Sequence, residues 1–342
     1  MSNQDRPLLL EVHNLRTYFF LDEGTVRAVD GADFVVYRGQ TLGVVGESGC
    51  GKSVTARSIL RIVPPPGRIV EGKILYHRVS KNGGSQVAET IDLTALDPRG
   101  REIRRIRGAE ISMVFQEPMT SLSPVHTIGN QIMEAIMLHQ NVTKEEAREK
   151  AIEMLDRVGM PQPQRTVDRY PHQLSGGMRQ RAMIAMALSC HPALLIADEP
   201  TTALDVTTEA QILKLMRELQ RDLGMAIMFI THNLGVIAQM TEDVIVMYLG
   251  KVVEATDVDT LFYNPKHPYT QALLRSIPRV GRKSRERLHV IPGWVPDPYS
   301  VPEGCPFHPR CDQVIRGVCE EVEPPYVEVE PGHQVRCHLY AR

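Results

Sequence analysis

The segment Gly46-Glu47-Ser48-Gly49-Cys50-Gly51-Lys52-Ser53 constrains the fold of this chain more than any other. It fits the pattern G-x-x-x-x-G-K-[ST] and lies between an apolar run, 41–45, and a predicted helix, 52–62. The glycines let the backbone curl so that successive N–H groups face one centre, and the start of the helix adds positive potential. We therefore predict that this segment, called the P-loop below, binds a nucleotide. Lys52 would reach the β- and γ-phosphates, and the Ser53 hydroxyl would ligate Mg²⁺.

Short apolar runs without alternation are followed by segments with helical spacing of apolar residues, a pattern typical of buried parallel strands joined by helices. Two strand-like runs near the N-terminus and a hairpin around Asn82-Gly83-Gly84 stand outside this alternation. The sequence therefore predicts an α/β fold. We expect strands at 8–20, 32–37, 41–45, 74–79, 87–93, 194–197 and 226–230, and helices at 52–62, 127–158 with a turn near 139–143, 175–188, 209–223 and 233–240.

Two carboxylates, Asp198 and Glu199, end the apolar run 194–197. At the carboxyl end of a parallel strand, Asp198 can hold the hydration shell of Mg²⁺ facing the P-loop. Glu199 is then placed to orient or deprotonate the water that attacks the nucleotide. A strand that ends in two acidic residues is, by itself, more often a solvated strand end. Together with the P-loop, the pair predicts nucleotide hydrolysis.

The segment Leu174-Ser175-Gly176-Gly177-Met178-Arg179-Gln180 forms a second candidate anion site. Two glycines after a capping serine expose backbone N–H groups at the start of a helix. Alone, the segment could equally be an N-capped helix. In combination with the P-loop and Asp198-Glu199, it resembles the signature motif of the ABC-transporter ATPases.

Further matches follow in the order of that family. Gln116, after Met113-Val114-Phe115, resembles the Q-loop glutamine, which implies a catalytic role and a Mg²⁺ contact. Ala203-Leu204-Asp205 resembles the D-loop, and His232, after Phe229-Ile230-Thr231, resembles the switch histidine that contacts the γ-phosphate.

The adenine-stacking aromatic of the family falls near Phe19 in this sequence. Its neighbours Tyr18 and Phe20 leave the register of that position open. Cys50 lies at a variable position of the P-loop, and we expect no chemistry of its own there.

The resemblance covers about residues 8–262 and implies an ABC ATPase domain over 1–262. Such a domain has a RecA-like core, an antiparallel β subdomain and a helical subdomain, here about 117–170, that touches membrane-spanning subunits. In this family two ATPase subunits join head to tail around ATP. Ser175, Gly176 and Gly177 would therefore serve a nucleotide bound mainly by the other subunit.

Two further segments narrow the resemblance to the importers of dipeptides, oligopeptides and nickel. One is Gln116–Pro124, and the other is the tail, with Asn264–Leu274 and Gly304–Cys311. This implies a motor subunit for peptide uptake at the cytoplasmic face of the membrane. Its partners would be a second, related ATPase chain, two membrane-spanning permease subunits and, indirectly, a solute-binding protein. The solute itself cannot be identified from these residues.

Four of the six cysteines, Cys305, Cys311, Cys319 and Cys337, crowd into the last 38 residues. Half of the 24 prolines fall after residue 262, so we expect a separate extension over 263–342 that is too short for a sizeable core. Four thiolates can hold Zn²⁺ or an iron–sulfur cluster, although no C-x₂₋₄-C pair is present. Free thiols remain an alternative. The resemblance to peptide importers favours one [4Fe–4S] cluster, far from the ATP.

Composition weighs against the rival functions. The net charge is −2, and a solvated helix explains the basic run 101–107 better than a nucleic-acid patch does. A soluble ABC ATPase of DNA repair would carry a long coiled coil between the two nucleotide motifs, and one of translation would carry two cassettes. A GTPase-type switch would need an N-K-x-D element, and none is suitably placed.

No apolar run approaches the roughly 18 residues that span a bilayer, and no signal-type segment begins the chain.

Overall fold

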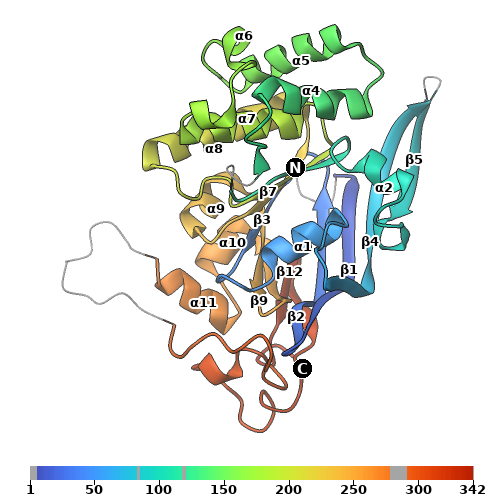
Figure 1. Cartoon of the computed structure of the whole chain (residues 1–342). Coiled ribbons are helices and arrows are strands. Elements are labelled where there is room, and N and C mark those ends of the chain that lie inside the picture. Colours follow the sequence, from blue (N-terminus) through green and yellow to red (C-terminus); the bar gives the residue numbers. More distant parts are fainter. Residues whose placement is uncertain (1–5, 83–84, 118–120, 278–290, 342) are drawn as a thin grey trace. The chain divides into compact units, whose positions relative to one another are not determined.

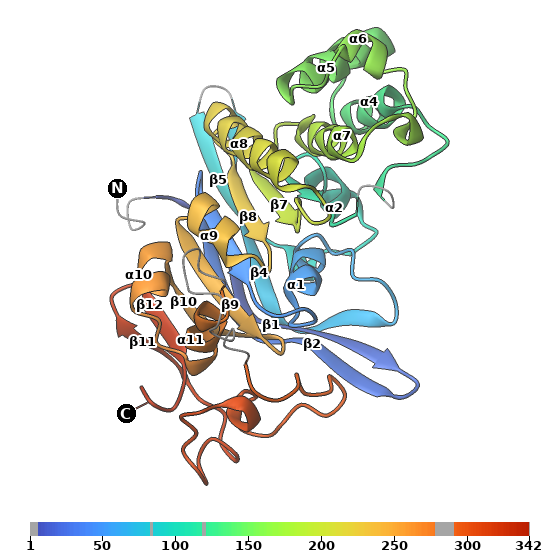
Figure 2. The ribbon, with the colours of Figure 1, turned by 90° about the vertical axis from the view of Figure 1, so that its left-hand side faces the viewer.

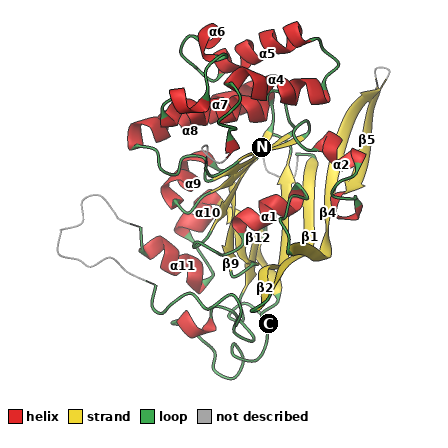
Figure 3. Cartoon of the chain, in the orientation of Figure 1, coloured by secondary structure: helices red, strands yellow, loops and turns green. Residues whose placement is uncertain are grey.

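The computed structural model describes residues 6–82, 85–117, 121–277 and 291–341 (Figure 1). These residues form two compact units. Unit 1 comprises the described residues of Met1–Leu9, Val36–Thr41 and Ala95–Ile230. Unit 2 comprises those of Leu10–Val35, Leu42–Thr94 and Thr231–Arg342. Figure 3 shows the helices and strands of each unit.

Unit 1 is built on three buried parallel strands in the order β8-β7-β6. They are β6 (Ile111–Val114), β7 (Leu194–Asp198) and β8 (Ala226–Ile230), and every residue in them is buried. Leu194 of β7 lies opposite Ile111 of β6 and Ala226 of β8. The continuous apolar runs therefore do form buried parallel strands, as predicted.

The helices of unit 1 begin at capping residues that the sequence makes recognisable. Thr143 and Glu146 form a reciprocal capping box at α5, and the Ser175 hydroxyl accepts a hydrogen bond from the Met178 N–H at α7. Helices α4, α5 and α7 pack against one another (Figure 1). No helix of the described residues is both long and apolar enough to cross a membrane. The helical elements are α2 (Arg101–Ile106), α4 (Ile128–His139), α5 (Lys144–Arg157), α6 (Pro163–Thr166), η3 (Pro171–Gln173), α7 (Gly176–Leu188) and α8 (Val206–Leu223).

Unit 2 contains a four-stranded sheet in the order β2-β1-β4-β5, in which the β1–β4 and β4–β5 pairs are antiparallel. The predicted hairpin is therefore correct, while the tip of its turn at 83–84 lies outside the described residues. Strand β2 begins earlier than predicted, and its first half alternates exposed and half-buried side chains. The strands are β1 (Leu8–Leu21), β2 (Gly24–Tyr37), β4 (Gly67–Asn82) and β5 (Ser85–Asp92), followed by the turn η2 (Leu93–Ala95).

A second sheet of unit 2 contains the strand that precedes the P-loop. Two strands from the tail of the chain lie at the edge of this sheet (red in Figure 2). Strand β3 (Thr41–Val45) runs parallel to β9 (Asp243–Tyr248), which pairs antiparallel with β10 (Lys251–Asp257). The tail adds β12 (His333–Arg336) beside β10 and β11 (Tyr326–Glu330) beside β12. The tail thus extends the sheet that begins at the P-loop strand.

Helix α1 (Lys52–Ile59) follows the P-loop and ends before the predicted residue 62, because Arg61 adopts a left-handed conformation. The other helices of unit 2 are α9 (Leu234–Met240), α10 (Val258–Tyr263), α11 (Pro268–Arg275) and the turn η4 (His308–Arg310).

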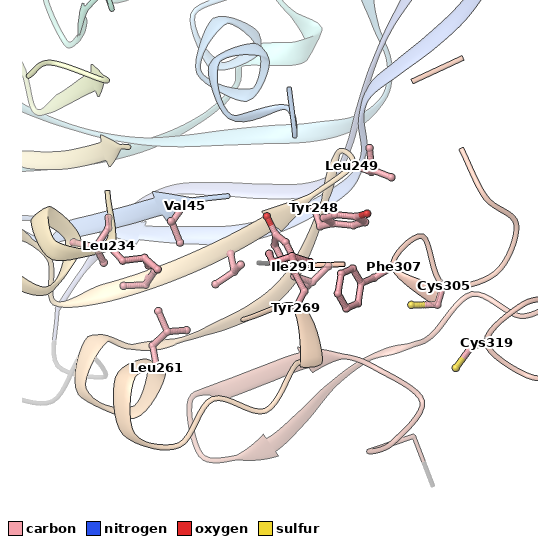
Figure 4. Close-up of a cluster of buried hydrophobic side chains, with 14 residues drawn as sticks. Val45, Leu234, Tyr248, Leu249, Leu261, Tyr269, Ile291, Cys305, Phe307 and Cys319 are labelled. Carbon is pink, nitrogen blue, oxygen red and sulfur yellow. The ribbon is translucent and has the colours of Figure 1, made fainter. Parts of the chain in front are cut away.

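The tail shares a hydrophobic core with the strands of unit 2. Tyr269 and Phe307 of the tail pack with Tyr248 of β9, with ring centroids 4.7 to 5.3 Å apart. Figure 4 shows these rings beside Val45 and Leu261, with Cys305 at the edge of the same cluster. This shared core supplies packing that a segment of this size cannot supply alone.

A buried carboxylate ties the tail to β10. Glu254 accepts hydrogen bonds from the N–H groups of Lys266 and His267, at 2.7 and 3.0 Å, and from the ring of His333 at 2.8 Å. Burial opposes ionisation, but these donors hold the pKa of Glu254 below its ordinary value.

Candidate functional site

The P-loop leaves β3 and curls into α1 as the sequence predicts. The Lys52 ammonium donates hydrogen bonds to the carbonyl oxygens of Gly46 and Glu47, at 2.8 and 3.0 Å. Lys52 is therefore folded over the loop, beside the place where phosphates would bind.

Two glycines of the P-loop are required by close contacts with the backbone. A Cβ at Gly46 would lie 2.2 Å from the carbonyl oxygen of Met247, and one at Gly51, whose φ is +101°, would lie 2.2 Å from that of Ala28. By contrast, Gly49 faces open space. The loop is thus fixed against β2 and β9 and keeps one open face.

Cys50 is buried, and burial raises the pKa of its thiol. This agrees with a packing role.

Glu47 makes contacts that the sequence did not predict. The Arg310 guanidinium donates to its carboxylate through two nitrogens, at 2.7 and 3.1 Å, and the Glu47 N–H donates to the Tyr269 hydroxyl at 2.9 Å. The sequence analysis therefore missed that the extension contacts the P-loop. The contact forms because α11 and η4 fold back onto β9 through the shared aromatic core. Arg310 and Glu47 are 263 residues apart, so neither charge balance nor residue spacing could have revealed this pair. The one available signal is that Tyr269 and Arg310 both lie in the tail segments that resemble peptide importers.

His232 is exposed at the start of α9, next to the P-loop strand. The preceding Thr231 donates its N–H to the carbonyl of Val44 in β3, at 3.1 Å. Asn233 caps α9 through its side chain. These contacts place His232 beside the carboxyl end of β3, where the P-loop begins.

The three candidate aromatics of β1 have different environments. The Tyr18 hydroxyl donates to Asp30 at 2.6 Å, and the Phe19 ring lies over Gly67 of the neighbouring strand. Phe20 is exposed, with the Arg68 guanidinium 4.5 Å from its ring centroid. The role of Phe19 as the adenine-stacking residue stays a prediction.

In unit 1, Glu199 follows β7 directly and its carboxylate is held from two sides. Gln116, after β6, donates its amide N–H to Glu199 Oε2 at 3.0 Å. The hydroxyl of Thr202 donates to the same oxygen at 2.9 Å. Asp198 beside it is 2% exposed. The structure therefore brings Gln116 and Glu199 together, and Thr202 is a further residue that the sequence analysis missed.

The loop Ser175-Gly176-Gly177 and the residue Asp205 begin two neighbouring helices, α7 and α8. A Cβ at Gly177 would lie 2.8 Å from Thr208 Cγ2, whereas Gly176 faces open space. The Asp205 carboxylate accepts the N–H groups of Thr207 and Thr208, and these hydrogen bonds lower its pKa. Asp205 is thus an N-cap of α8, a structural role that the D-loop assignment did not anticipate.

The structure does not support the predicted metal centre at the late cysteines. Among the described residues, no group of three or more His, Cys, Asp or Glu side chains is placed to hold a metal ion. Burial raises the pKa of Cys305 to about 11 and that of Cys337 to about 12, with a smaller effect from the neighbouring thiols. No disulfide joins the four cysteines that were predicted to bind the metal, which are Cys305, Cys311, Cys319 and Cys337.

Comparison with protein families gives two matches along the chain. The family described as "ABC transporter" matches residues 29–202, and the family "Oligopeptide/dipeptide transporter, C-terminal region" matches residues 253–319.

Curated relatives match the chain over nearly its full length. One from Sinorhizobium fredii, described as "Probable peptide ABC transporter ATP-binding protein y4tR", is 50% identical and covers 98% of this chain and 96% of its own length. The "Oligopeptide transport ATP-binding protein AppD" of Bacillus subtilis is 49% identical, with 97% of both chains covered. The "Dipeptide transport ATP-binding protein DppD" of the same organism is 47% identical over 97% of this chain and 94% of its own.

Two solved structures of an ATP-binding cassette match 73% of this chain. The ATP-binding cassette MJ0796, in a dimeric post-hydrolysis state bound to ADP and phosphate, has a TM-score of 0.61 and 26% identity. The match covers 73% of this chain and 99% of that one. A second dimeric structure of MJ0796 gives a TM-score of 0.62, with the same identity and coverage.

Proposed function

Because the chain belongs to the ABC transporter family of ATP-binding proteins, we propose that it is the ATP-hydrolysing motor subunit of an importer of di- or oligopeptides. The observation that carries this proposal is the similarity to peptide-transport ATP-binding proteins along both the cassette and the C-terminal region. A function on nucleic acid or ribosomes is not favoured, since the relatives named above are described as transport proteins.

In this proposal the P-loop and β7 bind MgATP. Lys52 leaves its carbonyl partners to contact the β- and γ-phosphates, and His232 contacts the γ-phosphate. Mg²⁺ prefers oxygen ligands. Here they would come from the Ser53 hydroxyl, the Asp198 carboxylate and the amide oxygen of Gln116. Mg²⁺ neutralises charge that develops on the phosphates. Phe19 stacks on the adenine.

Glu199 positions the attacking water and takes its proton. The contacts from Gln116 and Thr202 support this role, because two donors on one oxygen fix the direction of the carboxylate.

The second ATPase subunit completes the site. Ser175, Gly176 and Gly177 act on the nucleotide of the partner, with Asp205 at the same interface. The open space at Gly176 agrees with a surface that receives a ligand. The partner is a related chain, and the helical region 117–170 contacts the two permease subunits. A solute-binding protein delivers the peptide, and the chain is peripheral at the cytoplasmic face of the membrane.

We keep the [4Fe–4S] cluster as a proposal for the late cysteines, with zinc as the alternative. Two contacts support thiolate ligands: the N–H groups of Gln313 and Ile315 lie 3.4 Å from the sulfurs of Cys311 and Cys319. Protein purified without oxygen should be brown, with about four irons per chain. Cys311→Ser should bleach it. A colourless protein with one zinc would assign the site to zinc, and a metal-free protein would leave plain thiols.

Copurification from native membranes tests the main proposal. The tagged chain should bring with it two membrane-spanning proteins, a related ATPase and a peptide-binding protein, and cells without it should lose uptake of labelled peptide. Normal peptide uptake in such cells, or copurification with ribosomes, would refute the proposal.

A further inference from the structure

The C-terminal extension (residues 263–342, the tail) contacts the P-loop at Glu47, the second residue of the motif. The two-nitrogen contact of Arg310 with the Glu47 carboxylate is largely buried, with side-chain exposures of 4% and 25%. The Glu47 N–H donates a hydrogen bond to the Tyr269 hydroxyl and therefore points toward the extension. Both the side chain and the backbone of Glu47 are therefore held by the tail.

Arg310 is itself fixed in place. Its Nε donates to the Pro292 carbonyl at 3.1 Å, and its Nη1 lies 3.4 Å from the Tyr248 hydroxyl. The turn η4 that carries it follows Phe307, whose ring packs against Tyr248 and Tyr269 (Figure 4). A planar guanidinium held in this way can only meet a carboxylate in one orientation.

The contact has an electrostatic consequence for a loop that binds phosphate. An unpaired carboxylate in the P-loop would repel the triphosphate, and weak screening in a partly buried site makes that repulsion stronger. Arg310 neutralises Glu47 and so removes this repulsion. Lys52 donates hydrogen bonds to the carbonyls of Gly46 and Glu47. When ATP binds, Lys52 would leave these carbonyls for the phosphates. Glu47, which the tail holds, is therefore also a partner of the phosphate-binding lysine.

We propose that Arg310 and Tyr269 are positioning residues of the ATP site, through which the folded C-terminal extension sets the affinity for MgATP. Arg310 cancels the charge of Glu47, and Tyr269 anchors its backbone. This inference rests on the proposed ATPase function, and it extends that function by making the tail a part of the nucleotide site.

The test measures the dissociation constant for MgATP of the full chain by titration calorimetry. Arg310→Gln should weaken binding on the order of tenfold, and more at low salt than at high salt, because it leaves Glu47 unpaired. Glu47→Gln in the same chain should restore most of that loss, because no carboxylate is then left unpaired. A merely structural role of Arg310 would give no such rescue.

Tyr269→Phe provides a second variant that removes only the hydroxyl acceptor. It should weaken MgATP binding about threefold to tenfold, the range expected for one lost hydrogen bond. In the assembled transporter, both Tyr269→Phe and Arg310→Gln should raise the KM for ATP and leave kcat within about twofold. The matched control is Arg275→Gln, which removes an exposed arginine of the same extension that lies 3.7 Å from Asp312. It should change nothing.

Parental affinity in folded Arg310→Gln and Tyr269→Phe chains would overturn the inference and leave the ATPase function intact. Equal weakening by Arg310→Gln with and without Glu47→Gln would overturn the charge argument. A parent chain that binds no MgATP would overturn the proposed function itself.

Discussion

The amide nitrogen of Gln116 donates a hydrogen bond to the carboxylate of Glu199 over 3.0 Å, although 83 residues separate the two in sequence. They meet because β6 and β7 are parallel neighbours whose carboxyl ends lie at the same edge. A residue proposed to bind Mg²⁺ is thus in direct contact with the residue proposed to activate water.

Removal of the Glu199 charge should separate ATP binding from hydrolysis. Glu199→Gln should keep its affinity for MgATP and lower turnover on the order of 10²-fold or more, the size of a general-base loss. It should also trap a closed dimer, detectable by gel filtration with MgATP. The control is Glu218→Gln, whose exposed carboxylate lies 3.8 Å from the Lys214 ammonium. Hydrolysis by Glu199→Gln at the parental rate would show that Glu199 has another role.

Loss of the Thr202 hydroxyl should have a smaller effect on the same step. Thr202→Val removes one of the two donors to Glu199 Oε2, and a hydrogen bond to a charged group is worth about 1.5 kcal/mol. We expect kcat to fall roughly tenfold with the KM for ATP unchanged. Steady-state kinetics at several ATP concentrations distinguish this from a change in affinity, which would contradict the prediction.

A negative charge in the signature loop should affect the partner's site and spare the chain's own. Gly177→Asp tests this, but its Cβ would press on Thr208, so Gly176→Asp is the cleaner variant. The isolated variant should bind ATP normally, while the assembled transporter should lose hydrolysis by roughly 10²-fold or more through repulsion of the γ-phosphate. Gly176→Ala is the uncharged control. Weaker ATP binding by the isolated Gly176→Asp chain would mean that the loop serves its own nucleotide.

The stability of the extension should depend on pH through His267. Burial lowers the pKa of this imidazole to about 4, so the folded chain keeps it neutral while an unfolded chain protonates it near pH 6.5. Stability is therefore complete above pH 6.5 and falls as the pH drops toward 4, by up to about 3 kcal/mol. His267→Asn keeps a side-chain acceptor for the Tyr269 N–H and removes the titration. Thermal unfolding at pH 7 and 5 should show a larger drop for the parent than for the variant; equal drops would refute this prediction.

Much of the cassette could be predicted from the sequence because its signals are local. The runs 41–45 and 226–230 match the observed strands residue for residue, and every residue in these strands is buried. The cap at Ser175 and the turn near 139–143 depend on side chains within a few residues, so they were found as well.

The contacts that cross the chain could not be predicted in this way. Thr202 and Arg310 carry no periodic pattern, and their partners become neighbours only through the order of strands and the packing of aromatic rings. The tail was expected to depend on a metal because it is rich in proline and too short to form a core alone. Its core is completed by Val45 of β3 and Tyr248 of β9, which the tail sequence does not reveal.

Phosphate release from MgATP by the transporter reconstituted in lipid vesicles tests the central claim most directly. We expect the rate to rise when the peptide-binding protein is added with peptide, and to be lost in complexes that contain Glu199→Gln. A rate that ignores peptide, or that rises instead with added nucleic acid, would contradict the account of this chain as the motor of a peptide importer.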